Sequence, residues 1–317
     1  MRWTFLILTF ATVAWAKTDV VAETNSALED FATGRINVNA AVNRVKRAGG
    51  EEFASLELVT VYKRANEHDR APILEFLAGL AYRNKNVEDT FLRALTHQDP
   101  AEIVAAEIGL GRIRSGEGLK PLTANLGSQN FGVRREAARA LGLIGKPAAS
   151  APLLAAAKKE TDFDLKLLMI QSAGRAGDKK QVGTLEVLLK DSSESTRIAA
   201  AQALCAMGTP SCAKFAGTLL SSKEKTERLQ GVMLFEGASA KQSSKVLSPA
   251  LSDSDPRVRA RAARLLAEGG DESKKAWLVV ESAKAEGDTK LIYEDEIEPL
   301  RLTDEQRSAI LKKAGFK

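Results

Sequence analysis

A short segment recurs at regular intervals along the middle of the chain, and this repetition constrains the fold more than any other feature. The clearest copies begin at Val133, Leu165, Thr196, Glu227 and Val258, which lie 32, 31, 31 and 31 residues apart, and a weaker copy begins at Glu102. Self-similarity at a fixed period of this length is typical of repeat arrays, in which each unit packs only against its neighbours. The sequence therefore predicts a repeat array instead of one compact core.

The copies share a pattern of side chains that indicates a helix. In the copy at Val133, small or apolar side chains occupy Ala137, Ala138 and Leu141, and the other copies keep this spacing. Positions i, i+1 and i+4 lie on one stripe of a helix. Four copies end in a glycine, which is where a helix commonly ends: Gly145, Gly177, Gly208 and Gly270.

A second apolar column follows each copy and predicts a second helix. It consists of Leu122, Leu153, Leu185, Ala216, Leu247 and Leu278. Polar residues such as Asn130, Asp162 and Ser193 precede the next copy, and they can accept hydrogen bonds from the free N–H groups at a helix start. The sequence lacks the alternation typical of strands. We therefore predict an all-α fold of stacked helical hairpins, because one hairpin cannot bury its stripe alone.

The segment DSDPRVR at residues 253–259, followed by Ala262, Ala263 and Leu266, resembles a HEAT repeat. The short period is similar to that of the phycobilisome-lyase-type HEAT-like repeats. The resemblance covers six repeats over about residues 99–284. It implies a right-handed α-solenoid whose Val-Arg helices line the concave side, with protein binding as the usual role. The motif is specific for the fold and unspecific for function.

Two departures from the repeat pattern predict irregular stacking. Glu107 interrupts the apolar stripe of the first clear repeat. The repeat around Glu236 has no aspartate before Arg228 and lacks the small residue that the other repeats carry at the position of Gly142.

The first residues have the features of an export signal. Arg2 precedes an apolar run from Thr4 to Ala14, and a small-x-small pattern ends at Ala16. The run is too short to span a bilayer, which takes about 20 apolar residues. We therefore predict a signal peptide at residues 1–16, a periplasmic or secreted protein, and no stable membrane insertion of the mature chain.

The flanks of the repeats are predicted to be helical as well. Residues 17–50 read as an N-terminal helical cap, and residues 51–98 as one or more divergent helical repeats. Residues 285–317 read as an acidic linker followed by a C-terminal helix. The acidic run EDEIE at residues 294–298 is open to two interpretations: a solvated linker, or a contact for a basic partner or for the protein's own basic face.

The sequence offers little for catalysis. His68 and His97 are its two histidines, and zinc-ligand spacings, phosphate-binding loops and nucleophile elbows are absent. We expect both histidines on the surface, no metal, no cofactor and a non-catalytic protein. The alternative is an enzyme or enzyme subunit of the lyase-like HEAT group, which a pocket containing His68 or His97 with acidic neighbours would favour. A net charge of +5 with mixed signs and 5% aromatic residues disfavours a nucleic-acid binder.

Cys205 and Cys212 lie in one repeat. In an oxidising compartment two nearby cysteines favour a disulfide, and the bend of the hairpin would bring the sulfurs together. The alternative is that Cys205 simply fills a small buried position.

A basic residue recurs once per repeat, and this column has two interpretations. It consists of Arg134, Lys166, Arg197, Arg228 and Arg259. In one interpretation these side chains bond acidic residues of neighbouring turns, such as Asp162, Asp191 and Asp253. In the other they form a positive groove that binds an acidic segment of a partner protein, together with further arginines of the same helices: Arg135, Arg139, Arg261 and Arg264. The identity of the partner and the oligomeric state do not follow from the sequence.

Overall fold

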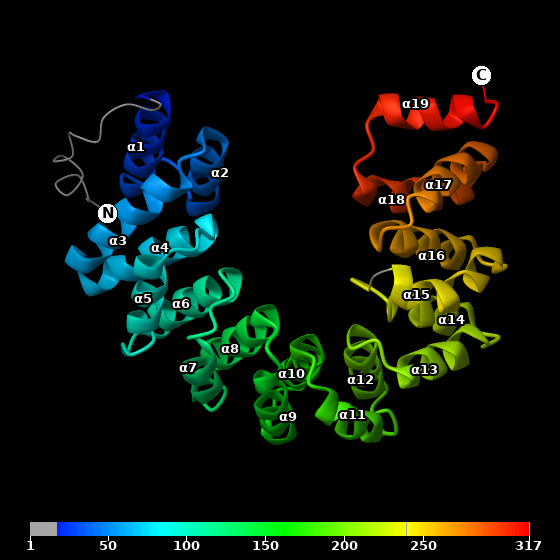
Figure 1. The fold of residues 1–317 in the computed structure, drawn as a ribbon, viewed down its shortest axis with the longest axis horizontal. Helices are drawn as coiled ribbons and strands as arrows, with labels where there is room; N and C mark the ends of the chain where they lie inside the picture. The colour runs from blue at the N-terminus through cyan, green and yellow to red at the C-terminus, as the bar shows by residue number, and fades with distance from the viewer. Residues whose placement is uncertain (1–17, 239, 317) are drawn as a thin grey trace. The chain divides into compact units, whose positions relative to one another are not determined.

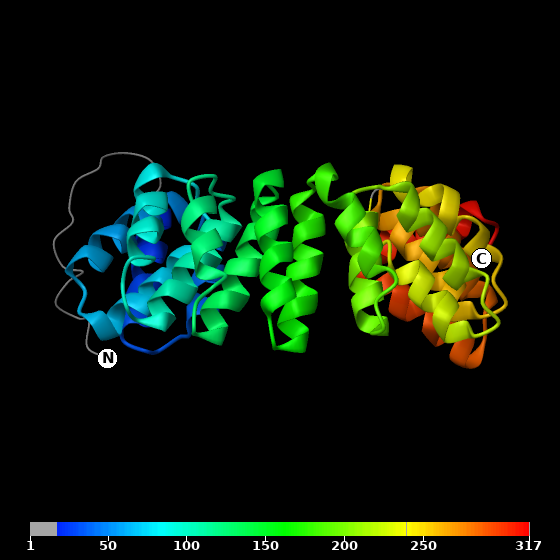
Figure 2. The ribbon, with the colours of Figure 1, turned by 90° about the horizontal axis from the view of Figure 1, so that it is seen from below.

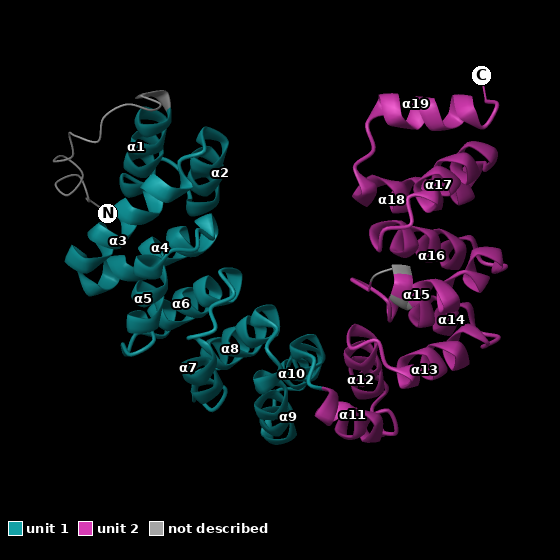
Figure 3. Cartoon of the chain, viewed as in Figure 1, with its two compact units in different colours: residues 1–178 teal, residues 179–317 magenta. Residues whose placement is uncertain are grey.

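The computed structural model describes residues 18–238 and 240–316, so the predicted signal peptide lies outside the described residues. The described residues are helical and contain no strand. They divide into two compact units, residues 1–178 and 179–317 (Figure 3). Among the described residues, no helix combines the length and apolar character that crossing a membrane would require.

The first unit contains ten helices in two rows (Figure 1). The even-numbered helices α2, α4, α6, α8 and α10 pack in succession and form one row, and the odd-numbered helices form a second row beside it. The bounds are α1 (Thr18–Ala32), α2 (Val38–Ala48), α3 (Glu51–Arg64), α4 (Glu67–Leu80), α5 (Lys85–Ala94), α6 (Pro100–Arg112), α7 (Leu119–Asn125), α8 (Phe131–Ile144), α9 (Ser150–Lys159) and α10 (Phe163–Ala176).

The second unit continues the pattern of paired helices. Its bounds are α11 (Val182–Leu188), α12 (Glu194–Ala206), α13 (Pro210–Leu220), α14 (Lys225–Met233), α15 (Ala240–Leu247), α16 (Pro256–Glu268), α17 (Ser273–Lys284), α18 (Gly287–Ile297) and α19 (Asp304–Lys313). Helix α16 contacts α14, α15, α17 and α18, and Tyr293 and Ile297 of α18 pack with Ala263 and Leu278 in a buried cluster. In each unit, short turns connect helices that lie side by side (Figure 2).

The local signals in the sequence explain where the helices begin and end. Asn130, Asp162 and Ser193 each accept a hydrogen bond from a backbone N–H of the first turn of α8, α10 and α12. Gly145 follows α8 with a φ of 66°, a left-handed conformation that closes the helix and that a side chain would strain. The prediction of an all-α solenoid of stacked helical hairpins is confirmed.

The acidic run at residues 294–298 is not a linker, because most of it belongs to α18. The buried side chains of Tyr293 and Ile297 are four residues apart and hold this helix on its neighbours. Burial of an aromatic and an aliphatic side chain of this size contributes roughly 2 kcal/mol each. The acidic residues between them therefore stand on an ordered helix.

Candidate protein-binding face

The arginines of the basic column donate hydrogen bonds to the turn that precedes the helix on which each of them lies. Nη1 of Arg134 donates hydrogen bonds to the carbonyl oxygens of Ser128 (3.0 Å) and Gln129 (3.1 Å). The same two bonds, to the carbonyls six and five residues earlier, are made by Arg197, Arg228 and Arg259. A guanidinium carries five N–H donors, so it satisfies two turn carbonyls and keeps donors for other partners.

Two of these arginines also bind a carboxylate of the next repeat in bidentate fashion. Nε and Nη2 of Arg134 donate to Glu160 at 2.8 and 3.1 Å, and those of Arg228 donate to Asp253 at 2.8 and 3.0 Å. These hydrogen bonds hold the pKa values of Glu160 and Asp253 below their ordinary values. Paired, parallel bonds of this kind are the stronger form of ion pair.

For these arginines the geometry supports the first interpretation of the column, bonding within the chain. The side chains of Arg134 and Arg228 are 19% and 12% exposed. Glu160 takes the place expected for Asp162, because Asp162 caps α10. Lys166 differs from the rest of the column, since no hydrogen bond or ion pair of its side chain is found among the described residues.

Arg261 and Arg264 of α16 are also engaged within the chain, so they do not project freely as the positive-groove interpretation requires. Their Nε atoms donate to the two carboxylate oxygens of Glu296 on α18, at 2.7 and 2.6 Å. Glu236 lies within 3.7 Å of both guanidinium groups, and Glu268 binds Arg264 as well. Through Glu296, the acidic run thus binds basic residues of the same chain, which is one of the interpretations that the sequence left open.

Helix α8 presents a different outward surface. Every fourth residue from its start is exposed: Phe131, Arg135, Arg139 and Leu143. The side chains of Arg135 and Arg139 are 47% and 53% exposed, and their Nε atoms share the single carboxylate of Glu136 at 3.1 and 3.5 Å. The Arg135 guanidinium lies 5.8 Å from the centre of the Phe131 ring, within cation–π distance. Two arginines on one carboxylate leave a positive charge facing solvent.

Apolar side chains on the two neighbouring helices border these arginines. At the equivalent outward positions, α6 carries Val104 and Ile108, and α10 carries Phe163 and Leu167. Helices α6 and α10 both pack directly against α8. None of the positions in the three stripes is acidic. We call this surface the α8 face: Val104, Ile108, Phe131, Arg135, Arg139, Leu143, Phe163 and Leu167.

The apolar members of the α8 face were not predicted from the sequence, although a signal was present. Phe131 and Phe163 each follow the capping residue of their helix in successive repeats, a position that points away from the buried stripe. An aromatic residue that recurs at an exposed position is a sign of a contact surface.

Beneath the α8 face lies a buried carboxyl group. Glu107 of α6 is fully buried, accepts a hydrogen bond from Nδ2 of Asn125 at 2.9 Å, and has no partner for its Oε2 atom. Burial raises the pKa of Glu107, the hydrogen bond from Asn125 lowers it, and the charge of Glu136 adds to the rise, so that the pKa is about 8. At neutral pH this carboxyl is therefore mostly uncharged, which allows it to sit in an apolar stripe.

His97 is not the free surface residue that the sequence suggested. Its Nδ1 atom lies 2.7 Å from Oε1 of Glu102, and that carboxylate, which is buried, also accepts a hydrogen bond from the Tyr62 hydroxyl. Burial and then the bond to Glu102 raise the pKa of Tyr62. The cluster joins α3, α6 and the turn before α6. Neither histidine lines the cavities beside α9, α13 and α18.

Cys205 at the end of α12 and Cys212 at the start of α13 form a disulfide in the structure, with Cα atoms 4.9 Å apart. Both side chains are buried. Among the described residues there is no group of three or more histidine, cysteine or acidic side chains that could hold a metal ion.

Comparison with known proteins identifies the repeats. The family model for HEAT repeats matches residues 88–171 and 150–234. The chain contains HEAT repeats. The match includes α8 and α10 and ends before α16, although the segment at 253–259 carried the resemblance in the sequence. The search of curated proteins finds no match.

Solved structures with similar folds include a phycocyanin lyase. The complex of CpcE and CpcF of phycocyanin lyase from Nostoc sp. PCC7120 aligns at a TM-score of 0.51 and 14% identity, over 78% of this chain and 94% of that chain. An engineered protein aligns at a TM-score of 0.45 and 18% identity, over 98% of this chain and 96% of that chain. The first likeness agrees with the expected similarity to lyase-type HEAT repeats and shows a shared fold.

Proposed function

We propose that this protein is an exported, non-catalytic HEAT-repeat scaffold that binds an acidic segment of another protein through the α8 face. The observation that carries the proposal is the pair Arg135 and Arg139, exposed side by side on one shared carboxylate and bordered by apolar side chains. A basic strip with apolar edges complements an acidic helix or strand that has apolar residues beside its carboxylates.

The chain contains its own example of this chemistry. Arg264 occupies the same position as Arg139 four repeats later, and Glu296 of α18 binds it. At the corresponding place beside Arg139, 32 residues later, α10 carries the uncharged Gln171 instead of a carboxylate. The phycocyanin lyase with a similar fold is a complex of two proteins, which supports a protein partner by analogy.

A non-catalytic role is supported by the state of the titratable groups. His97 is bound to Glu102, and Glu102 is bound to Tyr62, so the cluster satisfies itself. Glu107 is enclosed, whereas a catalytic group needs access to a substrate. The export part of the proposal rests on residues 1–16 and is tested by sequencing the N-terminus of the mature protein, which we expect to begin at Lys17.

The binding proposal is tested by co-purification from the envelope fraction of the source cells. We expect the variant R135E/R139E to lose partners that the wild type retains at low salt. The matched control is K158E/K159E, which makes the same change in charge at two exposed lysines of α9. Two new glutamates beside Glu136 would repel its carboxylate and destabilise α8. A milder variant, R135Q/R139Q, therefore removes the two positive charges without adding negative ones. Equal recovery of all partners with every variant would contradict the proposal.

A further inference from the structure

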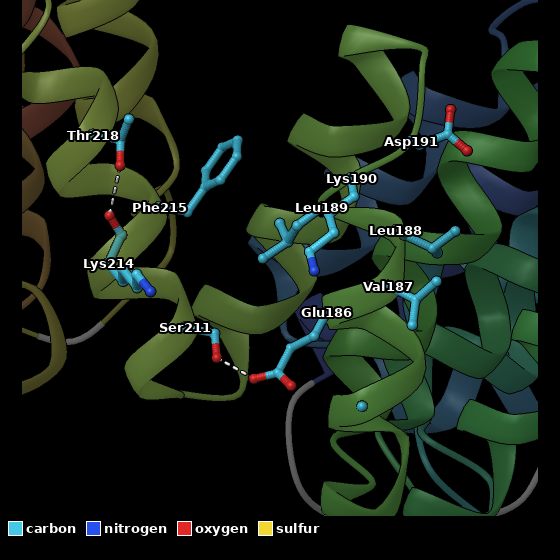
Figure 4. Close-up of a pocket in the computed structure, with 11 residues that line it drawn as sticks. Glu186, Val187, Leu188, Leu189, Lys190, Asp191, Ser211, Lys214, Phe215 and Thr218 are labelled. Atoms are coloured by element: carbon cyan, nitrogen blue, oxygen red, sulfur yellow. Dashed lines mark hydrogen bonds between the residues drawn. The ribbon is translucent and has the colours of Figure 1, made fainter.

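The second unit has a groove whose chemistry differs from that of the α8 face. A cavity of about 900 Å³ opens between α13 and the stretch formed by α11 and the turn after it (Figure 4). Leu188, Leu189 and Phe215 supply apolar lining, with Phe215 coming from the α13 side. This surface, which we call the α11–α13 groove, lies entirely within the second unit.

One of the residues that line this groove, Val187, is also highly exposed. Val187 on α11 is 70% exposed, more than any other large apolar residue in the described part of the chain. Exposure on this scale forgoes roughly 1–2 kcal/mol that burial of the side chain would contribute. A projecting side chain and an apolar hollow on the same patch are the two halves of a self-complementary surface.

The charges around the groove are balanced. Glu186 and Asp191 face the groove together with Lys190 and Lys214. A patch with equal numbers of acids and bases does not select a partner of one charge, as the α8 face does. In a twofold arrangement each lysine of one copy can instead face an acid of the other copy, so the patch complements itself.

The walls of the groove are held in place before any partner arrives. The Ser211 hydroxyl at the start of α13 donates a hydrogen bond to Glu186 of α11 (Figure 4), and the adjacent Cys212 forms a disulfide with Cys205 of α12. A preformed surface loses less conformational entropy on association than a mobile one.

We propose that a second copy of this chain docks on the α11–α13 groove, with the two copies related by a twofold axis and each placing Val187 in the groove of the other, beside Phe215. The contact is isologous, so it closes at a dimer, and it uses no residue of the α8 face. This inference does not depend on the proposed function, because the two surfaces lie in different units.

Sedimentation velocity of the chain from Lys17 onward tests the dimer over a wide range of concentration. We expect a concentration-dependent dimer for the wild type, and a dissociation constant raised at least about 100-fold by V187D, since each dimer carries the change twice and a buried unpaired charge is costly at both sites. The matched control is L291D, because Leu291 of α18 is 63% exposed and lies outside the groove. That variant should associate like the wild type.

A photoreactive amino acid at position 187 locates the contact. In a mixture of light and heavy-isotope protein, we expect cross-links between copies to reach residues 210–220. A wild type that stays monomeric, a dimer that V187D leaves intact, or cross-links that map elsewhere or to another protein would each overturn the proposal. R135E/R139E should still dimerise, so a failure of the α8 face and a failure of the dimer are separate results.

Discussion

Helices α8 and α16 are equivalent helices four repeats apart, and Arg139 and Arg264 occupy the same position in them, yet the exposed arginines of α8 and those of α16 have different surroundings. On α16, Arg261 and Arg264 are bound by Glu296 of the adjoining helix, and Arg264 is 11% exposed. On α8, Arg135 and Arg139 share one carboxylate of their own helix and remain exposed. The difference teaches that the neighbouring helix, and not the repeat itself, decides whether a basic residue is part of the structure or part of a surface.

The acids of the two regions also differ in their electrical state. Glu296 is paired with two cations, whereas Glu107 beneath the α8 face is enclosed and has one neutral partner, Asn125. We therefore expect opposite effects on stability: replacing Glu107 with glutamine should stabilise the protein at alkaline pH, and replacing Glu296 with glutamine should destabilise it.

The largest effect is expected from E107Q at alkaline pH. The folded pKa of about 8 lies above the ordinary value of 4.5, so the wild type loses stability as the pH rises from about 4.5 through 8. At 1.36 kcal/mol per pKa unit, the full loss approaches about 4–5 kcal/mol. E107Q removes the titration and keeps an oxygen for Asn125. Urea denaturation at pH 5 and pH 9 should show the variant clearly more stable at pH 9 and nearly unchanged at pH 5.

E117Q is the control for this experiment, because Glu117 is exposed. It should follow the pH profile of the wild type. A wild type whose stability does not fall between pH 5 and pH 9 would show that Glu107 ionises without cost and would remove the contrast between the two acids.

A smaller effect is expected from E296Q, which leaves two partly buried guanidinium groups without their carboxylate. Breaking such a pair should cost about 2 kcal/mol, less than for a fully buried pair because solvent reaches part of the cluster. The second expected result is a gain: α16 should then resemble the α8 face and retain acidic partners in the co-purification. D288N is a suitable control at an exposed acid of the same helix. Stability equal to the wild type would mean that the α16 arginines do not need Glu296.

How far the sequence predicted this contrast depends on the range of each signal. Helix caps such as Asp162 and the terminating Gly145 act on residues close to them in the sequence, and the apolar stripe repeats with the period. The hairpins of the repeats could therefore be predicted from the sequence. The pairing of Glu296 with Arg264 spans 32 residues, which is one period, but the repeat pattern was followed only to about residue 284, so the sequence did not predict this pair. The helical character of the acidic run had a signal in the spacing of Tyr293 and Ile297, but the acids between them favoured a linker.

The surroundings of the buried or partly buried titratable side chains were the hardest feature to predict from the sequence. In the sequence, Glu107 interrupts the apolar stripe of its repeat. A carboxyl group is tolerated in a core when its environment keeps it neutral. For Glu107 that environment comes from α7 and α8, which the sequence of α6 does not show. His97 was expected on the surface because it lies in the turn before α6, and the sequence does not show that Tyr62 of α3 meets Glu102 of α6 beside it. Exposure of Phe131 and Phe163 depends likewise on what packs over them.

Within the basic column, Arg134 and Lys166 offer a further comparison of moderate size. R134A removes two bonds to turn carbonyls and a bidentate pair with Glu160, and we expect a loss of about 1–2 kcal/mol of unfolding free energy. K166A should change stability little, because that side chain has no bond in the described structure. Thermal unfolding of both variants checks this, and an equal effect of the two would contradict a structural role for the arginine.

The smallest effect on stability is expected from R135Q/R139Q. A small effect would show that the two arginines are not needed for folding. Exposed ion pairs contribute about 0–1 kcal/mol, and these two arginines compete for one carboxylate, so their removal should change the unfolding free energy by about 0.5 kcal/mol or less. The same variant should weaken binding of acidic partners, with an effect that fades as salt screens the charges. A pair of side chains that matters for binding and not for folding is a surface kept for a partner. A large loss of stability would instead place Arg135 and Arg139 with Arg261 and Arg264, as part of the structure.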